Sequence, residues 1–317
     1  MIIAVTGPTG DIGRALLRRL DADPLVTRVL GMARRPFDPG SLGLEKTEYT
    51  QGDVLDRDSV AALAADADVL VHLAFIIVGG REEARAVNLE GSRNVFEAAR
   101  DVGRLVYTSS VAAYGFHADN PQPLTEDVPV RGTDGHYYSA QKAELEQALR
   151  EALDGAETEA YVFRPCIVAG GDALALVRAF PGLLRKSPVG PVLPDPGTPF
   201  QLVHTEDVAL ALAAAVRGEG EPGVYNLAGA GTISVADLAH ALGWHAVPVP
   251  RAGVAVSAAV TGRLPLMPPQ ASWLNALRVP VVMDTTRARE RLGWSPLHDT
   301  KAVLADTARS AREAGLL

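Results

Sequence analysis

Cysteine is almost absent from this sequence, and that absence limits how the chain can be held together. Among 317 residues there is one cysteine, Cys166, so no disulfide can form within the chain. The apolar run at the start, residues 1–5, is too short for the core of a signal peptide. The sequence therefore predicts a cytoplasmic protein in which Cys166 is a small core residue.

Positive charge is also scarce. The chain has 30 Lys and Arg against 38 Asp and Glu, a formal net charge of −8. Nucleic acids and anionic membranes both select an excess of basic residues, so neither is expected as a partner. Long apolar runs are missing too, because the longest, residues 252–260, is about half of the roughly 20 residues that a membrane-spanning helix needs. A small-molecule substrate is the expected partner.

What the sequence does contain is an alternation of short apolar runs with helix-length amphipathic segments. The apolar runs of strand length occur at residues 2–5, 26–32, 47–51, 69–73, 105–108 and 160–163, and the longest predicted helices cover residues 81–100 and 138–153. This βαβ rhythm predicts an α/β fold, a doubly wound parallel sheet (Rossmann) of six or seven strands with helices on both faces.

The pattern changes after Pro165. Glycine and proline become frequent, and helix-length pieces follow in irregular order. We therefore expect the dinucleotide-binding Rossmann domain at residues 1–165 and a smaller, mainly substrate-binding lobe at residues 166–317. Two later apolar segments, near residues 201–209 and 224–228, are predicted to return to the main sheet, which makes the C-terminal substrate lobe discontinuous.

A glycine-rich segment, Thr6-Gly-Pro-Thr-Gly-Asp-Ile-Gly13, joins the first predicted strand to the first helix. In this position glycines let backbone amides and the helix N-terminus approach a pyrophosphate. The spacing is GxxGxxG, and an ordinary strand-to-helix turn uses glycine too. We expect a dinucleotide here, bound by the turn residues Gly7, Thr9, Gly10, Asp11, Ile12 and Gly13.

The ends of the next two predicted strands bear on which dinucleotide binds. NAD sites usually place an acid at the end of the second strand, whereas this chain has Ala33 followed by Arg34 and Arg35. A guanidinium fork suits a 2′-phosphate, so the sequence favours NADP(H) over NAD(H), unless both arginines are solvated loop charges. Asp53, beside Val54 at the end of the third strand, is expected to accept the adenine amino group, and the alternative is a solvated loop acid.

A tyrosine and a lysine stand four residues apart in His136-Tyr-Tyr-Ser-Ala-Gln-Lys142. On a helix, Tyr138 and Lys142 share a face. A cation beside a phenol favours the phenolate, so Lys142 is expected to lower the Tyr138 pKa from its usual value of about 10 toward neutral pH. The pair predicts proton transfer, and beside a dinucleotide it predicts hydride chemistry. Tyr137 is the neighbouring alternative, but Gln141, four residues later, cannot tune a phenol.

Taken in order, the motifs resemble those of the extended short-chain dehydrogenase/reductase family, the NAD(P)-dependent epimerase/dehydratase-like group. The resemblance covers nearly the whole chain. It rests on the glycine turn, the Tyr138 and Lys142 pair, Gly52-Asp-Val54, His72-Leu-Ala74, Val87-Asn-Leu-Glu-Gly91, Tyr107-Thr-Ser-Ser-Val-Ala-Ala-Tyr-Gly115, Phe163-Arg-Pro165, Val203-His-Thr-Glu-Asp207 and Leu292-Gly-Trp-Ser-Pro296.

By this resemblance, Tyr138 is the general acid or base, Lys142 tunes it and binds the nicotinamide ribose, and Ser110 orients the substrate carbonyl. Ser109 is the competing serine, but Ser110 has the family's spacing to Tyr114. No metal is expected, because His72 and His204 have no metal-ligand spacing. The resemblance implies a homodimer formed through the two long helices. It places around the cofactor Val54, Leu73, Ala74, Asn88, Thr108 and Pro165.

Two departures from the family pattern narrow the chemistry. Sugar-nucleotide dehydratases of the family carry an Asp-Glu pair after the serine, whereas this chain has Val111 and Ala112. Many sugar-nucleotide members have an asparagine where this chain has Ile167. The chain is then more similar to reductases of hydrophobic ketones, such as the hydroxysteroid and flavonol-type members, whose substrates need an apolar pocket.

The leading hypothesis is therefore an enzyme, an oxidoreductase that uses NADP(H), with NAD(H) as the alternative cofactor. It would reduce a ketone or aldehyde of a hydrophobic small molecule, or oxidise the alcohol. An NDP-sugar epimerase of the same family is the alternative, because it uses the same three residues. A nucleotide-sensing regulator of the NmrA-like kind is a third hypothesis, although such proteins commonly lose the Tyr and Lys pair that this chain keeps.

Overall fold

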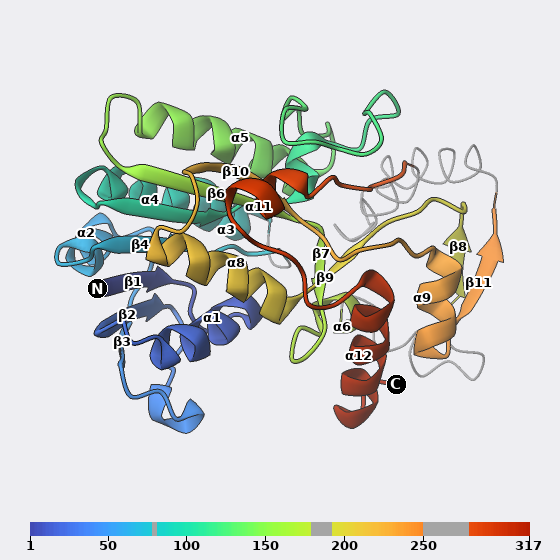
Figure 1. The fold of residues 1–317 in the computed structure, drawn as a ribbon, viewed down its shortest axis with the longest axis horizontal. Coiled ribbons are helices and arrows are strands. Elements are labelled where there is room, and N and C mark those ends of the chain that lie inside the picture. The colour runs from blue at the N-terminus through green and yellow to red at the C-terminus, as the bar shows by residue number, and fades with distance from the viewer. Residues whose placement is uncertain (78–80, 179–191, 250–278) are drawn as a thin grey trace.

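A parallel seven-stranded sheet forms the centre of the computed structural model, which describes residues 1–77, 81–178, 192–249 and 279–317. The order across the sheet is β10-β6-β5-β4-β1-β2-β3, which confirms the predicted doubly wound sheet (Figure 1). The apolar run at residues 252–260 lies outside the described residues. The strands are β1 (Ile2–Thr6), β2 (Arg28–Ala33), β3 (Thr47–Gln51), β4 (Val69–His72), β5 (Arg104–Thr108), β6 (Glu159–Pro165) and β10 (Gly223–Leu227).

The strand order reverses between β1 and β4. From β1 the chain builds outward through β2 and β3, and from β4 it builds in the other direction through β5 and β6. In register, Thr6 at the end of β1 lies opposite Met32 of β2 and His72 of β4. In open parallel sheets, ligands bind beyond the carboxyl ends of the strands at such a reversal. The topology therefore places the candidate site where β1, β4 and β5 end.

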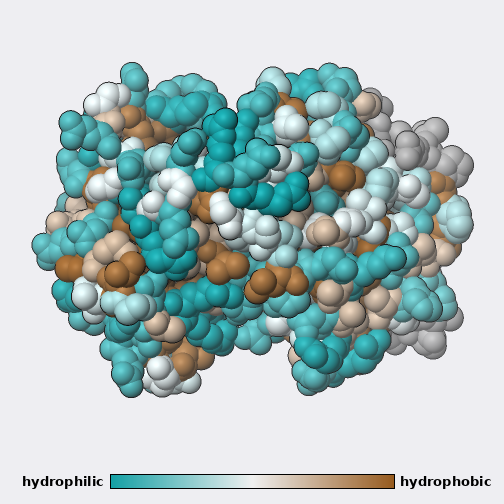
Figure 2. All heavy atoms as spheres, viewed as in Figure 1, coloured by the Kyte–Doolittle hydropathy of each residue, from teal (hydrophilic) through white to brown (hydrophobic). Residues whose placement is uncertain are grey.

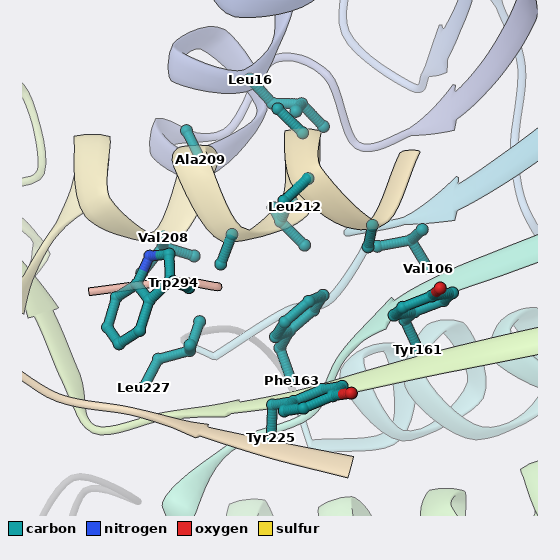
Figure 3. Packing of buried hydrophobic residues seen from close by; sticks show 14 of the residues in the cluster. Leu16, Val106, Tyr161, Phe163, Val208, Ala209, Leu212, Tyr225, Leu227 and Trp294 are labelled. Carbon is teal, nitrogen blue, oxygen red and sulfur yellow. The ribbon is translucent and has the colours of Figure 1, made fainter. Parts of the chain in front are cut away.

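Helices cover both faces of the sheet (Figure 1). The helices α1 (Asp11–Ala22) and α8 (Thr205–Arg217) pack together on one face, and α2 (Arg57–Ala64), α4 (Ser92–Ala98) and α5 (Tyr137–Ala152) lie on the other. Figure 3 shows Leu16 of α1 and Leu212 of α8 over Phe163 of β6, and all three side chains are fully buried. Burial of each such side chain contributes about 1.5–3 kcal/mol.

The segment predicted as one helix over residues 81–100 is a helix with a wider turn inside it. The α-helices α3 (Arg81–Arg85) and α4 are joined by a π-helical turn, Ala86–Gly91, and a 3₁₀ turn, Ala99–Asp101, follows. The wider turn buries Val87, Asn88 and Leu89. The polar member of this group, Asn88, is fully buried.

The C-terminal lobe lies beyond the carboxyl ends of the main strands (Figure 1). It contains two two-stranded parallel sheets, β7 with β9 and β8 with β11, and a third apolar core lies between α9 and α12. The elements are β7 (Ile167–Ala169), α6 (Ala175–Arg178), β8 (Val192–Asp195), β9 (Leu202–His204), α9 (Val235–Leu242), β11 (His245–Pro248), α11 (Thr286–Arg291) and α12 (Thr300–Glu313).

One of the two segments predicted to return to the main sheet does so. Gly223–Leu227 pairs with β6 as the edge strand β10. The prediction for residues 201–203 is wrong, because β9 pairs with β7, the strand that directly follows β6, while β10 already occupies the position beside β6. The chain after β9 does rejoin the main layers, since α8 packs against α1.

Apolar residues lie in small, separate patches among hydrophilic ones on the face shown in Figure 2. None of the helices in the described part of the chain is long and apolar enough to cross a bilayer. Cys166 is a free, buried thiol whose pKa is raised by burial, as suits a core residue.

Candidate active site

The glycine turn follows β1 and opens α1. Gly7 has a φ of +73°, and a Cβ there would lie 2.7 Å from the backbone nitrogen of Ala74, while a Cβ on Gly13 would lie 2.5 Å from the Gly7 carbonyl oxygen. Around Gly10 the nearest atom would be 3.6 Å away, and no described side chain caps the helix there. Two glycines thus close the turn, and the third leaves room at backbone N–H groups for a pyrophosphate, so the residues fit a dinucleotide.

The other residues of the turn lie at the start of α1. The Thr9 carbonyl oxygen accepts a hydrogen bond from Arg14 Nε at 3.1 Å. Asp11 is the first residue of α1, and its pKa is raised mainly by burial, while Arg14 and Arg178 act in the opposite direction. Ile12 packs against the apolar core. The turn is therefore fixed by the protein's own contacts.

The residues predicted around the adenine and the adjoining backbone lie where β3 and β4 end. Asp53 Oδ1 accepts a hydrogen bond from the Leu55 backbone nitrogen at 3.1 Å, and Val54 is buried. Leu73 follows β4 and donates its backbone N–H to the Thr6 carbonyl oxygen at 3.1 Å, which ties this loop to the glycine turn. Contact of Asp53 with adenine stays a prediction.

Arg34 and Arg35 follow β2 and are both exposed. Arg34 Nη1 donates to Glu83 Oε1 at 2.8 Å, in an ion pair with a residue of α3. Glu83 was missed in the sequence, since it lies 49 positions away from Arg34. The Glu83 carboxylate lies beside the guanidinium that was predicted to bind a 2′-phosphate, and its negative charge would repel such a phosphate. The arginine predicted to select NADP(H) therefore already has an acidic partner.

The two adjacent serines after β5 point to different partners. Ser110 caps the 3₁₀ turn Val111–Tyr114 by accepting from the Ala112 backbone nitrogen at 3.2 Å, and its side chain lies near enough to the Tyr138 phenol to act on the pKa of that phenol. Ser109 Oγ donates to Glu146 Oε1 at 2.6 Å, inside the protein. The structure therefore brings Ser110, and not Ser109, to the phenol.

Tyr138 and Lys142 share the buried face of α5, as their spacing predicts. The helix begins beside His136, whose Nδ1 accepts from the Ser139 backbone nitrogen at 3.3 Å. Lys142 Nζ donates to the Thr108 carbonyl oxygen at 2.9 Å, and the Thr108 hydroxyl is buried without a hydrogen-bond partner among the described residues. Tyr137 is oriented differently, because its hydroxyl donates to the Ile77 carbonyl oxygen.

The charge states of the pair differ from the expectation. Burial raises the pKa of Tyr138 to about 12, although the hydrogen bond from Ser110 acts to lower it. Burial lowers the pKa of Lys142 to about 7, with Glu146 acting to raise it. The prediction that Lys142 brings the phenol pKa down toward neutral pH is therefore wrong for the protein alone, because removal of the phenol from water raises that pKa. The phenol keeps its proton at neutral pH.

A buried ion pair that the sequence did not reveal lies beneath the serines. Glu146 of α5 accepts from Arg164 Nη2 at 2.6 Å and from Arg164 Nε at 2.9 Å, and both side chains are almost fully buried. The Arg164 guanidinium also lies 4.5 Å from the centre of the Tyr114 ring. The only feature of the sequence that points to the Glu146 and Arg164 pair is that Glu146 stands one helical turn after Lys142. The pair joins α5 to β6 directly behind Ser109.

Asn88, in the π-helical turn, links the loop after β4 to α5. Its Oδ1 accepts from the Ile76 backbone nitrogen at 2.7 Å, and its Nδ2 donates to the Ile76 carbonyl oxygen at 2.9 Å and to Gln141 Oε1 at 2.8 Å. Asn88 therefore ties the loop after β4 to α5, and its predicted place near the cofactor stays a prediction. Pro165 ends β6 and is buried, and its approach to a nicotinamide stays a prediction.

The sequence pattern that defines the NAD-dependent epimerase/dehydratase family matches residues 3–228, which include every site residue described above. The chain belongs to this family. Its members are enzymes that use a nicotinamide dinucleotide, in agreement with the glycine turn and the Ser110, Tyr138 and Lys142 group.

Relatives within and around the epimerase/dehydratase family differ in chemistry. The chain is 33% identical to a ceramide reductase of Caulobacter vibrioides over 218 residues, 68% of this chain and 61% of that protein, so the match spans less than two thirds of the relative. WbmH of Bordetella bronchiseptica, solved with NAD⁺, is 20% identical over 99% of both chains with a TM-score of 0.71. A UDP-glucose 4-epimerase of Thermotoga maritima, solved with UDP-glucose, is 19% identical over 99% of both, with a TM-score of 0.73. These two structures share the fold.

Three apolar side chains lie in segments that follow strand ends or belong to the loops near the predicted site. Val111, directly after Ser110, is 8% exposed, and Ile167, at the start of β7, is 37% exposed. Ile77, whose carbonyl oxygen accepts from Tyr137, is 43% exposed. Among the described residues, no group of three or more His, Cys, Asp and Glu could hold a metal ion.

Proposed function

We propose that this protein is a nicotinamide-dependent reductase that converts a ketone or aldehyde of a hydrophobic small molecule into the alcohol. The observation that carries the proposal is the Tyr138 phenol, which is buried, keeps its proton at neutral pH, lies near Ser110 and shares the buried face of α5 with Lys142. A protonated phenol next to a second hydroxyl is what a carbonyl oxygen needs when it becomes an alkoxide. The reverse oxidation uses the same groups.

Each group of the site has a separate role in the proposed reduction. The glycine turn and the N-terminus of α1 would hold the dinucleotide, which when bound supplies the hydride that reduces the carbonyl carbon. The Ser110 and Tyr138 hydroxyls donate hydrogen bonds to the carbonyl oxygen, and Tyr138 passes its proton to that oxygen as negative charge develops on it. Lys142 stabilises the phenolate left behind, until a proton from water restores the phenol. Carbon is reduced, and oxygen gains one proton.

The substrate class is inferred from the apolar side chains that follow the catalytic groups. Val111 and Ile167 replace the polar residues that sugar-nucleotide members use; Val111 is buried, while Ile167 and Ile77 are exposed apolar side chains. Each buried CH₂ group of a substrate contributes about 0.8 kcal/mol to binding, so a long alkyl chain gains several kcal/mol from such a surface. The relative named as a ceramide reductase supports a lipid-like ketone as the substrate.

NADPH is proposed as the preferred reductant, because two arginines follow β2 where an acid would select NADH. The ion pair between Arg34 and Glu83 makes this preference conditional, since Glu83 must release the guanidinium for a 2′-phosphate. NADH is the alternative, and it is favoured by the structural neighbours that contain NAD⁺.

An NDP-sugar epimerase is the second candidate function, favoured by the likeness of the whole chain to epimerase structures. Epimerases of this kind retain their cofactor and consume none. A regulator of the NmrA-like kind is a weaker third candidate, because the chain keeps the catalytic residues. We also propose a homodimer through α4 and α5, which a sizing measurement in solution would test.

The experiment that tests the proposed function is a substrate screen with the purified protein. Loss of nicotinamide absorbance is followed with NADPH and with NADH against 3-keto-alkyl amides, steroid ketones and UDP-hexoses. We expect stoichiometric oxidation of the nicotinamide with a lipid-like ketone and none with UDP-hexoses. Interconversion of a UDP-hexose without consumption of reduced nicotinamide would establish the epimerase instead.

A further inference from the structure

One aromatic side chain from the loop after β4 contacts both Tyr138 and Lys142. The Phe75 ring meets the Tyr138 ring edge-on, with 5.4 Å between centroids and an interplanar angle of 90°. Lys142 Nζ lies 3.9 Å from the centroid of the same Phe75 ring. Phe75 is therefore a third element that holds the catalytic phenol and the catalytic ammonium in one arrangement.

The ammonium is otherwise poorly supplied with partners in the described structure. It is removed from water, and the hydrogen bond that the described residues offer it is to the Thr108 carbonyl oxygen at 2.9 Å. The centroid of the Tyr107 ring lies farther away, 5.2 Å from Lys142 Nζ. The face of an aromatic ring attracts a cation, most strongly when the cation is desolvated, and 3.9 Å is well within the roughly 6 Å range of that attraction.

The backbone around Phe75 is held on both sides, so the ring has a defined position. Before it, Ala74 lies against Gly7 of the glycine turn. After it, Asn88 binds both the N–H and the carbonyl oxygen of Ile76, and Tyr137 donates its hydroxyl to Ile77. Asn88 also bonds Gln141 of α5, and Tyr137 is itself part of α5. These contacts tie the loop that carries Phe75 to the helix that carries Tyr138 and Lys142.

We propose that Phe75 is a positioning residue that keeps the Lys142 ammonium charged and in a fixed position relative to the phenol, by presenting its ring face to Nζ and packing edge-on against the Tyr138 ring. This proposal rests on the proposed function for the roles of Tyr138 and Lys142, but the placement of the ammonium does not require catalysis. Phe75 touches no reacting atom in this account and acts through the two residues it contacts.

The charged and titratable groups around Lys142 define what a measurement can detect. Glu146, one turn along α5, attracts the ammonium, while His72 is buried and has a pKa lowered to about 3, so it is neutral over the relevant range. Tyr138 and Tyr107 have raised pKa values and stay protonated. Lys142 is then the group near this site that changes charge near neutral pH.

The test is a titration of Lys142 by NMR in protein labelled with ¹³C-lysine and free of substrate. The chain has four lysines, at positions 46, 142, 186 and 301, so the Lys142 signal is assigned by its loss in Lys142→Met. Phe75→Leu removes the aromatic face but keeps apolar volume, and we expect the titration midpoint to fall by about 0.5–1 pH unit. Phe75→Tyr keeps an aromatic ring, so its Lys142 titration midpoint should equal that of the wild type.

A matched control separates this effect from a general loss of packing. Phe163→Leu removes a fully buried ring on the opposite face of the sheet, so it should lower thermal stability and leave the Lys142 midpoint unchanged. If Phe75→Leu does not fold, Phe75→Met tests the same loss of an aromatic face. An unchanged or raised midpoint in Phe75→Leu, or an equal shift in Phe163→Leu or Phe75→Tyr, would overturn the proposal.

The pH dependence of turnover offers an independent second measurement. Lys142 loses its positive charge as pH rises through its titration midpoint. On the alkaline side of the pH profile, kcat/KM of Phe75→Leu should therefore begin to fall at a lower pH than kcat/KM of the wild type. The Lys142 midpoint can stay unchanged in Phe75→Leu even if the protein is a reductase, and it can shift as expected even if the protein has another activity. Failure of the positioning role and failure of the proposed function are thus distinguishable.

Discussion

The Ser109 hydroxyl donates a 2.6 Å hydrogen bond to the buried Glu146, which leaves the adjacent Ser110 as the candidate catalytic serine. Successive residues of an extended segment point to opposite sides, so the inward turn of Ser109 leaves Ser110 directed at Tyr138. The spacing to Tyr114 favoured Ser110, and the hydrogen bonds of both serines supply the physical reason.

Substitution of each serine in turn should separate catalysis from stability. We expect Ser110→Ala to lower kcat/KM by about 10²-fold, because a hydrogen-bond donor to the developing alkoxide is lost. Ser109→Ala should keep turnover within a few-fold and lower the free energy of unfolding by about 1–3 kcal/mol, because Glu146 loses a buried donor. Steady-state kinetics and urea unfolding measure both. The reverse pattern would show that Ser109 is the catalytic serine.

The buried pair of Glu146 and Arg164 should behave as one unit. Arg164→Met leaves a buried carboxylate without its cation, so we expect a loss of about 3–5 kcal/mol in the free energy of unfolding. The double variant Glu146→Leu with Arg164→Met removes both charges and should cost much less than the sum of the single changes. A double-mutant cycle by urea unfolding measures this, and additive costs would show that the pair is not coupled.

His72 should make the protein less stable in mild acid. Burial, the largest cause, and then Lys142 lower its pKa to about 3, against an ordinary 6.5, so between these values the unfolded chain binds a proton that the folded protein does not. Stability contributed by neutral His72 is therefore present above pH 6.5 and lost as pH falls. His72→Asn removes this dependence, although it also loses the hydrogen bonds to Thr6 and Ser92.

The measurement for His72 is a comparison of urea unfolding at pH 6.5 and pH 5. The stability gap between the wild type and His72→Asn should narrow by about 2 kcal/mol over this interval, because one proton per molecule is worth about 1.4 kcal/mol per pH unit. Other titrating groups are common to both proteins and cancel. A gap of constant size would mean that His72 takes up its proton in the folded protein.

Cofactor choice should depend on Arg34 and on its partner Glu83. We expect Arg34→Ala to weaken NADPH binding by about 10–100-fold, because a charge-assisted hydrogen bond to phosphate is lost, and to leave NADH binding almost unchanged. Glu83→Gln should strengthen NADPH binding by releasing the guanidinium. Arg28→Ala, which removes an exposed arginine paired with Glu48, is the charge-matched control. Fluorescence titration measures each dissociation constant, and equal weakening of both cofactors would contradict the assignment.

How far the sequence predicts this protein depends on whether the relevant contacts are local. The main sheet is predictable because each buried strand, such as β4, is a continuous apolar run, and the spacing of Tyr138 and Lys142 places them on one face of a helix. The pairing of β9 with β7 could not be predicted, because a strand of three residues carries no signal for its partner. That choice is made by tertiary packing.

The surroundings of the catalytic pair show the same limit at the level of single residues. The pKa of Tyr138 was predicted with the wrong direction, because spacing reveals a neighbouring cation but not the loss of water around the phenol. Phe75 and Glu83 were missed because their contacts with Lys142 and Arg34 cross 67 and 49 positions of the chain. Only the fold brings these side chains together.

The most direct test of the central claim is a comparison of Tyr138→Phe with the wild type on a ketone that the wild type reduces. Loss of the phenolic proton donor should lower kcat by about 10²–10⁴-fold, since this is what a general acid contributes. Binding of NADPH, measured by fluorescence, should stay within a few-fold of the wild type. Full turnover by Tyr138→Phe, with oxidation of NADPH matching formation of the alcohol, would contradict the account.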